Sequence, residues 1–535
     1  MRVYARIPRR SSVMRLVVMS FIAFLILETL SLFFARHQGN RRESVHSTPA
    51  YSSNRKQATS SFIEFATSTT KDANYQDISE SIQNLTRAMS NHPSGVSTIR
   101  EIEIAADWFI SAIHRYQSIP PHLSSFNRNV SLEDIRDLSS FAKMYYISQS
   151  VLHNSELSIT LADPTRQKLQ HISEMIEPGL FSFLGSTSLQ AWRESYSGRG
   201  IVITTGDTYA WHTIHLLTTL RDVLNCTLPV QVFYNGPADL NEAFRDRISK
   251  ISHVEVVDLY TLLPLSDIKG WALKPLIMFA SRFREVILLD SDTLFVQDPS
   301  ILFDFKLYKE TGVVFFKDRS LTEPRSDIPE VLSRLFMYPS STVKNFRMWA
   351  HDNTRHQQES GVVVIDKGRD AFYGLLLTCQ LNVSPFRELL YSIFHGDKET
   401  FWIGQELTGV SYGFMERYAG SVGRQEMIQG IIAMCGYIAH VDEEDALLWW
   451  NGGLLKEKTD VLGEFLEFKQ FSVDIPSTRT HWSTQNGHFC QLIQDSGNEC
   501  RDLSENGRKV IERYKEIWED LRIEMMDFKE TVRLK

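Results

Sequence analysis

The chain has 535 residues, and its 57 Lys and Arg against 65 Asp and Glu give a formal net charge of −8. This acidic balance argues against a nucleic-acid partner, because binding to a phosphate backbone requires a positive field. A hydrophobic share of 43% with only 17 Pro supplies a large core and argues against bulk disorder and collagen. The five Cys contain no C-x-x-C pair, which argues against a disulfide scaffold and a zinc finger.

A long apolar segment lies near the N-terminus. Residues 16–35 are apolar at all but four positions, and at about 1.5 Å per residue their length matches the hydrocarbon core of a bilayer. Residues 1–15 contain five Arg and no acidic residue, so the positive-inside rule places them in the cytosol. We predict a single-pass type II signal anchor with the rest of the chain in a lumen. A cleaved signal peptide is the alternative.

Two regions of different composition follow the predicted anchor. Residues 36–98 are rich in Ser, Thr, Asn, Gln and charge, which predicts a stem without a core of its own. In residues 99–195 the pattern becomes helical: Ser131 and Asp134 have capping-box spacing, and apolar residues recur at helical intervals after them. We predict a helical lumenal region there.

From residue 196 onward the pattern alternates between strands and helices. Short apolar runs bounded by turn residues predict strands at 201–204, 230–234, 254–257 and 286–289, and later at 362–365. Helical spacing between them predicts helices at 209–224, 240–251 and 271–282. This alternation predicts an α/β fold with a mostly parallel central sheet, whose ligands bind at the carboxyl ends of the strands.

The D-x-D triplet Asp290-Ser291-Asp292 directly follows the predicted strand 286–289. On an extended segment, residues two apart share a face, so both carboxylates can point at one place. Two like charges about 4 Å apart repel by about 4 kcal/mol at an effective dielectric near 20, and a divalent cation reverses that sign. We therefore predict Mn²⁺, or alternatively Mg²⁺, between the aspartates and a nucleotide diphosphate. The alternative is a solvated turn after a strand.

Several motifs in this order resemble the fungal alpha-1,3-mannosyltransferases of glycosyltransferase family 71. They are GIVITTGDTYAWHTIHLLTTLRD (200–222), LPVQVFYNG (228–236), GWALKPLIMFASRFREVILLDSDTLFVQDP (270–299), QESGVVVIDKGR (358–369), GDKETFWIGQEL (396–407) and CGYIAHVDEEDALLWWNGGLLK (435–456). The resemblance implies a type II Golgi membrane enzyme with a GT-A-like fold. It further implies Mn²⁺, GDP-mannose as donor and a mannose-terminated glycan as acceptor, joined in alpha-1,3 linkage with retention. Residues 196–370 would bind the nucleotide sugar, and residues 371–535 would bind the acceptor.

The resemblance also implies roles for residues on the donor side. Asp290 and Asp292 correspond to the D-x-D that holds the metal and the donor. Thr204, Thr205 and Gly206 would receive the base, Lys274 would reach a phosphate, and Glu359 and Ser360 would face the sugar. An exposed lysine on a surface helix and a polar edge-strand cluster are the alternatives for Lys274 and for the Glu359 group.

Later residues supply the remaining predictions. His440 is expected to be the third metal ligand, with His481 and His488 as competitors, and Lys456 is expected to close over the diphosphate. Asp397, Gln405 and Glu406 are candidates for positioning the acceptor, with Glu406 as the carboxylate that faces the sugar. Trp402, Trp449 and Trp450 either stack on sugars or belong to the core.

The sequence leaves two rival functions undecided, and it also suggests one disulfide. A GT-A transferase that uses a UDP-sugar and a non-catalytic glycan-binding relative share the same motifs, whereas a glycoside hydrolase has no need of carboxylates at i and i+2. Cys490 and Cys500 are close enough in sequence to form a disulfide in an oxidising lumen. The acceptor class and the oligomeric state are not determined by the sequence.

Overall fold

The computed structural model describes residues 130–533 and seven residues between 102 and 110. Within the main range it leaves out 155–160, 186, 320–326, 337–338, 350–353, 355, 475–480, 486–487 and 494–498. The predicted cytosolic tail, anchor and stem therefore lie outside the described residues. Among the helices of the described part, none combines the length and the hydropathy that a bilayer crossing needs.

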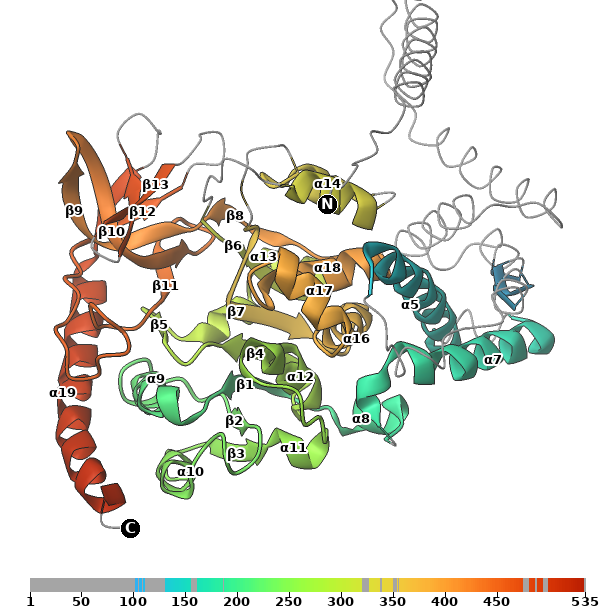
Figure 1. The fold of residues 1–535 in the computed structure, drawn as a ribbon, viewed down its shortest axis with the longest axis horizontal. Coiled ribbons are helices and arrows are strands. Elements are labelled where there is room, and N and C mark those ends of the chain that lie inside the picture. Colours follow the sequence, from blue (N-terminus) through green and yellow to red (C-terminus); the bar gives the residue numbers. More distant parts are fainter. Residues whose placement is uncertain are drawn as a thin grey trace, which may run out of the picture. The chain divides into compact units, whose positions relative to one another are not determined.

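A seven-stranded sheet forms the centre of the molecule (Figure 1), with the strand order β3-β2-β1-β4-β7-β6-β8. Its strands are β1 (Arg199–Thr204), β2 (Val230–Tyr234), β3 (Val254–Asp258), β4 (Glu285–Leu289), β6 (Val313–Lys317), β7 (Gln358–Asp366) and β8 (Phe414–Tyr418). The first four strands are parallel to one another, whereas β7 runs antiparallel to both β4 and β6. The predicted α/β class is confirmed. The antiparallel direction of β7 was not predicted, because the composition of a buried strand does not specify its direction.

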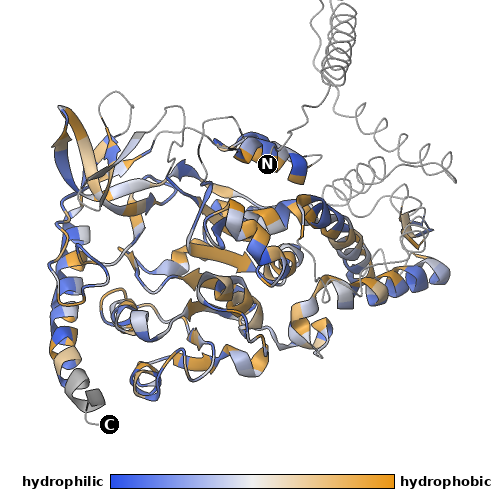
Figure 2. Ribbon diagram, viewed as in Figure 1, coloured by the Kyte–Doolittle hydropathy of each residue, from blue (hydrophilic) through white to orange (hydrophobic). Residues whose placement is uncertain are grey.

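Helices cover both faces of this sheet. Along β1, Ile201 and Ile203 belong to one hydrophobic core and Val202 to the other, as the alternation of side chains along a strand requires. One core includes α5 (Leu132–His153), α7 (Asp163–Leu180), α12 (Leu273–Ala280), α16 (Ala371–Leu381) and α18 (Lys398–Thr408). The other includes α9 (Ala210–Asp222), α10 (Glu242–Ser249) and α19 (Glu505–Arg533). Hydrophobic residues dominate the strands of the sheet, and hydrophilic residues gather on α7 and α19 (Figure 2).

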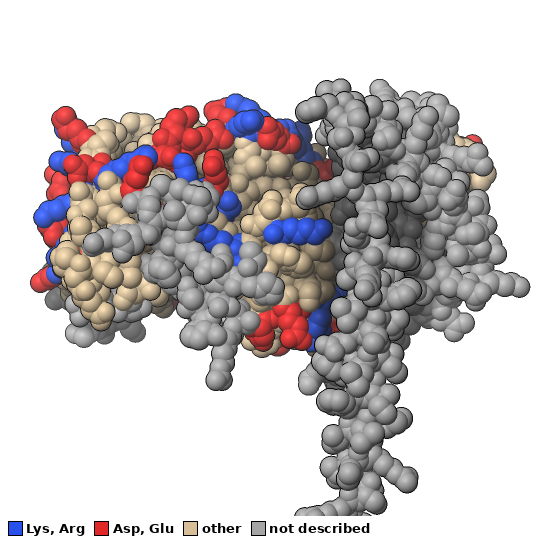
Figure 3. Space-filling model, turned by 90° about the horizontal axis from the view of Figure 1, so that it is seen from above, with Lys and Arg blue, Asp and Glu red and all other residues tan. Residues whose placement is uncertain are grey.

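Shorter helices connect these elements. They are α8 (Leu189–Ser195), α11 (Leu259–Leu262), α13 (Lys306–Thr311), α14 (Ile328–Leu335), α15 (Ser341–Lys344) and α17 (Phe386–Ile393). On the described part of the face shown in Figure 3, acidic and basic side chains are interspersed.

The helical region before the sheet is part of the same core. Ser131 and Asp134 form the predicted capping box at the start of α5: the Ser131 side chain accepts from the Asp134 N–H, and the Asp134 carboxylate accepts from the Ser131 N–H. Helix α5 contacts α7 and α18, and the Tyr146 hydroxyl donates to Asp370 at 2.9 Å. The helical region therefore supports one face of the central sheet by direct packing.

A second, antiparallel sheet lies beside the first (Figure 1) and was not predicted. It runs in the order β13-β14-β10-β9-β12-β15, and β11 joins β10 to β5. Its strands are β5 (Thr293–Phe295), β9 (Gly420–Ile428), β10 (Ile431–Val441), β11 (Leu447–Asn451), β12 (Gln470–Val473), β13 (His481–Gln485), β14 (His488–Leu492) and β15 (Glu499–Asp502). The β9–β10 turn has positive φ at Gln429 (51°) and Gly430 (83°), which is the backbone of a tight hairpin turn.

Helix α19 contacts both β5 of the second sheet and α9, which covers one face of the first sheet. The Tyr514 hydroxyl donates to the backbone oxygen of Phe295 in β5 at 2.6 Å. The Tyr514 backbone oxygen lies 3.0 Å from His215 Nε2 in α9. Trp518 contacts the rings of His212 and His215, so both histidines are core residues, and burial lowers the pKa of His215 to about 4.

The disulfide joins Cys435 to Cys490, so the pairing of Cys490 with Cys500 is wrong. Cys435 on β10 and Cys490 on β14 are direct cross-strand partners in the antiparallel ladder. Cys500 lies on β15 and forms no disulfide. Proximity in sequence pointed to Cys500, whereas strand pairing places a residue 55 positions away opposite Cys490.

The disulfide can be tested by peptide mapping under non-reducing conditions. We expect a linked peptide pair that contains Cys435 and Cys490, both in the wild-type chain and in Cys500→Ser. Cys435→Ser should lose this link and about 4 kcal/mol of stability, because the cross-link restricts a long loop in the unfolded chain. A linked peptide of Cys490 and Cys500 would contradict the assignment.

Candidate active site

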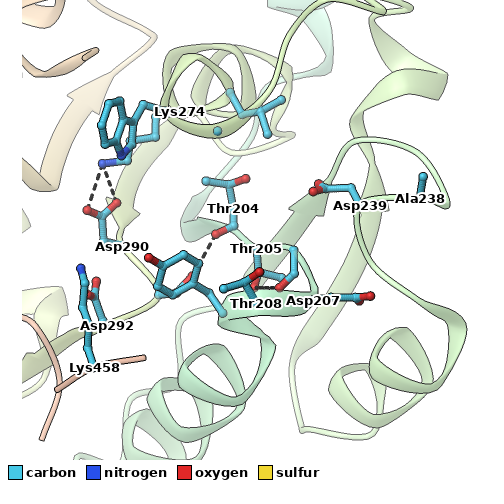
Figure 4. A pocket seen from close by; sticks show the side chains of 16 residues that line it. Thr204, Thr205, Asp207, Thr208, Ala238, Asp239, Lys274, Asp290, Asp292 and Lys458 are labelled. Carbon is cyan, nitrogen blue, oxygen red and sulfur yellow. Dashed lines mark hydrogen bonds and ion pairs between the residues drawn. The ribbon is translucent and has the colours of Figure 1, made fainter. Parts of the chain in front are cut away.

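A cavity of about 500 Å³ opens at the carboxyl ends of β1 and β4 (Figure 4). It is lined by Thr204, Thr205, Gly206, Asp207, Thr208, Tyr209, Ala238, Asp239, Gly270, Trp271, Leu273, Lys274, Asp290, Ser291, Asp292 and Lys458. The predicted base, phosphate and D-x-D residues thus share one cavity, at the sheet edge where α/β folds bind ligands.

The D-x-D lies in a turn between β4 and β5 rather than in an extended segment. The Thr293 N–H donates to the Asp290 backbone oxygen at 3.1 Å. The Ser291 hydroxyl donates to the Thr204 backbone oxygen at 3.0 Å, which fixes the middle residue against β1. Both carboxylates still line the cavity, so the predicted convergence is present although its backbone geometry differs.

Asp290 is paired with a buried lysine. Lys274 Nζ, from α12, lies 2.7 Å from Asp290 Oδ1 and 2.9 Å from Oδ2. The Lys274 side chain is only 7% exposed, so the surface-lysine alternative is wrong. Burial alone would lower the pKa of Lys274, but the charges of Asp290 and Asp397 raise it above its usual value and keep the ammonium protonated.

A buried relay behind the cavity holds Lys274 in place. Lys274 Nζ donates to Ser360 Oγ at 3.3 Å, and Ser360 Oγ donates to Asp397 Oδ2 at 3.3 Å. Burial raises the pKa of Asp397 to about 6, while the nearby Lys274 acts in the opposite direction. Asp397 and Ser360 therefore contact Lys274 instead of lining the cavity.

Asp292 is paired with an exposed lysine. Lys458 Nζ lies 3.1 Å from Asp292 Oδ2, and the Lys458 side chain is 44% exposed. The backbone of Asp292 is also fixed, since the N–H groups of Gly452 and Gly453 donate to its carbonyl at 3.1 and 2.8 Å. The loop after β11 is thus attached to the D-x-D through both backbone and side chain.

Lys458 takes the place that the sequence predicted for Lys456. Lys456 Nζ forms an ion pair with Glu464, and its side chain is 46% exposed and does not line the cavity. The sequence placed a basic residue in this loop correctly, but the loop conformation determines which of two nearby lysines reaches the aspartates.

A second buried polar group lies on β7 and α18. Glu359 Oε1 accepts from Asn451 Nδ2 at 3.0 Å and from the Gly361 N–H at 2.9 Å. Burial raises the pKa of Glu359 to about 7. Every residue of β7 is buried, so the edge-strand alternative is wrong, and Glu359 lies outside the lining of the cavity.

His440 does not join the aspartate pair. Its ring stacks on Trp449 with a centroid distance of 4.2 Å and meets the edge of Phe316 at 5.1 Å. Burial lowers its pKa to about 3. Among the described residues, no three carboxylate, imidazole or thiol groups converge on one point. The reason is strand pairing, because His440 on β10 lies directly opposite Trp449 on β11 inside the core.

Glu406 and Gln405 are also placed elsewhere by the structure. Glu406 accepts from the Ser340 N–H at 2.6 Å, from the Ser340 hydroxyl at 2.8 Å and from the Tyr412 hydroxyl at 2.9 Å. Gln405 Nε2 donates to the Ala371 backbone oxygen at 3.0 Å. Neither lines the cavity, so the prediction that they position the acceptor there is not supported. Trp402, Trp449 and Trp450 are fully buried core residues.

The donor set of the cavity fits a hard divalent cation. Asp290 and Asp292 offer carboxylate oxygens to the cavity, and Mg²⁺ and Mn²⁺ are commonly held by one or two carboxylates together with substrate phosphates. Their partners in the structure are Lys274 and Lys458, whose charges offset the repulsion between the two carboxylates. A diphosphate would supply the remaining oxygen ligands.

Comparison with known proteins shows that this chain is similar to mannosyltransferases. Residues 198–442 match a family described as "Mannosyltransferase putative". The chain is 30% identical over 333 residues to "Putative alpha-1,3-mannosyltransferase MNN12" of Candida albicans, a match that covers 51% of this chain and 39% of that protein. It is 27% identical over 299 residues to "Alpha-1,3-mannosyltransferase MNT2" of Saccharomyces cerevisiae, covering 48% of this chain and 52% of that protein.

These matches confirm the resemblance to the fungal alpha-1,3-mannosyltransferases that the sequence motifs predict. The matched parts span only 39% and 52% of the two relatives' lengths. A crystal structure of the galactosyltransferase LgtC with donor and acceptor sugar analogues aligns with 40% of this chain and 73% of its own, at 16% identity. Its TM-score of 0.25 is too low to define a shared fold.

The buried acids of the site predict how stability depends on pH. Glu399 accepts from the Gln357 N–H at 2.9 Å and from Trp402 Nε1 at 2.6 Å, and burial raises its pKa to about 7. The folded chain therefore holds a proton that the unfolded chain releases near pH 4, so stability falls as pH rises towards 7.

We expect this decline to be shallower in Glu399→Gln, by roughly 1–3 kcal/mol between pH 5 and pH 8. Urea unfolding at several pH values measures it. Glu416→Gln, at an exposed position, is the control for loss of a carboxylate and should keep the wild-type slope. Equal slopes in all three proteins would contradict the burial argument.

Proposed function

We propose that this chain is a metal-dependent glycosyltransferase with a GT-A-like fold that moves mannose from GDP-mannose to a mannose-terminated glycan. The linkage formed is alpha-1,3, with retention of the anomeric configuration. The observation that carries the proposal is the cavity in which Asp290 and Asp292 lie beside Lys274 and Lys458. The match of residues 198–442 to a mannosyltransferase family supports the choice of sugar.

The charged groups of the cavity suit a nucleotide diphosphate as leaving group. Asp290 and Asp292 would hold Mn²⁺, or alternatively Mg²⁺, which when bound supplies Lewis-acid stabilisation of the departing diphosphate. Lys458 is exposed enough to turn from Asp292 towards a phosphate oxygen, where its charge stabilises the leaving group. Lys274 is held by Asp290, Ser360 and Asp397, so it presents a fixed positive charge.

The reaction also requires that the sugar be oriented without exposure to water. Glu359 lies on β7, next to the Ser360 that contacts Lys274, and its buried carboxylate is fixed by Asn451 and Gly361. The Asp318–Lys398 ion pair, at 2.6 Å, continues this buried polar group. None of these side chains lines the cavity, so their contribution is indirect: they fix the backbone of β7 beside the Ser360 that contacts Lys274.

We also propose that the protein is a single-pass type II protein of the Golgi membrane, anchored by residues 16–35 with its catalytic part in the lumen. The Cys435–Cys490 disulfide supports an oxidising compartment. A UDP-sugar transferase and a glycan-binding relative are the competing functions, and the experiment below separates all three.

The proposed activity can be tested with a donor panel. We expect the purified full-length chain with Mn²⁺ to transfer mannose from GDP-mannose to mannobiose, and to use UDP-sugars at least about a hundredfold less well. Asp292→Ala should abolish transfer because it removes one of the two carboxylates, while expression and thermal stability remain near wild type. Chelation by EDTA should stop transfer, and added Mn²⁺ should restore it.

Transfer from a UDP-sugar alone would establish the rival transferase. Binding of mannobiose without transfer from any donor would establish a glycan-binding relative. Wild-type activity in Asp292→Ala would contradict the assignment of the D-x-D.

The two lysines of the loop after β11 provide a matched pair of variants. Lys458→Met removes the charge that reaches Asp292, and we expect kcat/KM for the donor to fall about 10- to 100-fold. Lys456→Met removes an exposed ion pair with Glu464 and should stay within about twofold of wild type. Steady-state kinetics with GDP-mannose measure both. A larger loss in Lys456→Met than in Lys458→Met would contradict this assignment.

A further inference from the structure

The cavity has a second acidic end. Figure 4 shows Asp290, Asp292 and the two lysines on one side and Asp239 on the other, with Thr204 and Thr205 between them. If the phosphates of a nucleotide bind at the lysines, as the proposed function requires, its base extends towards Asp239. The inference below rests on that function and concerns the identity of the base.

The Asp239 carboxylate is held in place by its backbone and by one hydrogen bond. Asp239 lies in a turn after β2, where its N–H donates to the Gly236 oxygen at 3.0 Å and its own oxygen accepts from the Asp207 N–H at 2.9 Å. The Asn235 N–H donates to Asp239 Oδ2 at 2.9 Å. Within the part of the chain that the structure describes, Oδ1 has no hydrogen-bond donor.

Gly206 leaves room for this carboxylate at the end of β1. Its φ of −133° and ψ of −179° are extended values that any residue can adopt, so backbone conformation does not require glycine. A Cβ at this position would lie 2.7 Å from Asp239 Oδ1, which is too close. The Asp239 backbone oxygen would also lie only 3.0 Å from that Cβ, so Asp239 as a whole favours glycine here, and the two residues line the cavity together.

The neighbouring acid, Asp207, points in another direction. Its Oδ1 accepts from both the backbone N–H and the side-chain Nδ2 of Asn241, at 2.8 and 3.0 Å. In Figure 4 the Asp239 carboxylate points towards Thr204, whereas the Asp207 carboxylate points away from it. Asp239 is therefore the carboxylate at this end that faces the rest of the cavity. Burial raises its pKa, and the charge of Asp207 adds to this effect, so a ligand with N–H donors would be favoured there.

Nucleobases differ in the groups they can present to a carboxylate. Guanine offers two adjacent donors, N1–H and the 2-amino group. Uracil offers one N–H between two carbonyl oxygens, whose lone pairs repel a carboxylate, and adenine and cytosine place a ring acceptor beside their amino group. We propose that Asp239, placed against Gly206, is the residue that selects guanine over the other bases of a nucleoside diphosphate.

Inosine diphosphate (IDP) provides the sharpest test, because it is GDP without the 2-amino group. Titration calorimetry of the full-length chain with Mn²⁺ should show that the wild type binds GDP at least about tenfold more tightly than IDP, and IDP more tightly than UDP. Asp239→Asn should reduce the GDP-to-IDP ratio to below about threefold. Gly206→Ala, which displaces the carboxylate, should do the same.

Two controls separate base selection from general damage. Asp258→Asn alters an acid that accepts from the Gly236 and Tyr260 N–H groups outside the cavity lining, so it should keep the wild-type ratio. Pyrophosphate, which has no base, should bind Asp239→Asn as tightly as wild type. Loss of pyrophosphate binding would overturn the inference, since Asp239 would then maintain the cavity rather than select the base.

A wild-type GDP-to-IDP ratio near one, or an unchanged ratio in Asp239→Asn, would also overturn the inference. These results are distinct from failure of the proposed function. An enzyme that transfers mannose from GDP-mannose with an unchanged ratio in Asp239→Asn retains its function and loses only this assignment. A chain that transfers no sugar from GDP-mannose loses the function itself.

Discussion

The site depends on the pairing of a buried lysine with the first aspartate of the D-x-D. Lys274 is buried and Asp290 is partly buried, and each needs the other, because an unpaired charge in the interior costs several kcal/mol. Ser360 and Asp397 complete the surroundings of the lysine. The second aspartate, by contrast, is paired with the exposed Lys458. One half of the D-x-D is therefore held rigidly, and the other half can exchange its partner for a ligand.

The antiparallel sheet gives the second half its position. Strand β5 begins at Thr293, directly after Asp292, and pairs with β11. The two glycines that follow β11 donate to the Asp292 carbonyl, and the loop that they begin carries Lys458. The second sheet thus connects the cavity at the ends of β1 and β4 to a distant loop, since Lys458 and Asp292 are separated by 166 positions in the sequence. The core residues Trp449 and Trp450 keep this connection in place.

Much of the part of the fold that forms the cavity could be predicted from the sequence because its signals are local. Strands β1, β2, β3 and β4 are short apolar runs with turn residues at both ends, and the D-x-D follows a buried strand at a sheet edge.

The features that could not be predicted involve non-local pairing. The direction of β7, the Cys435–Cys490 bond and the burial of His440 against Trp449 all depend on which strands lie side by side, which composition does not encode. The position of Glu406 away from the cavity has a similar reason, since its partners Ser340 and Tyr412 come from other elements. Asp239 carries no motif of its own, and its place at the site depends on the turn after β2 and on contacts with residues at the end of β1.

The central claim is that Asp290 and Asp292 form a site for a divalent cation and a nucleoside diphosphate together. A crystal of the chain soaked with MnCl₂ and GDP tests it most directly, with the anomalous signal of manganese as the readout. We predict one manganese peak between the two aspartates and the GDP phosphates, with Lys458 turned towards a phosphate oxygen. Bound GDP without manganese at this pair, or a cavity that contains neither, would contradict the account.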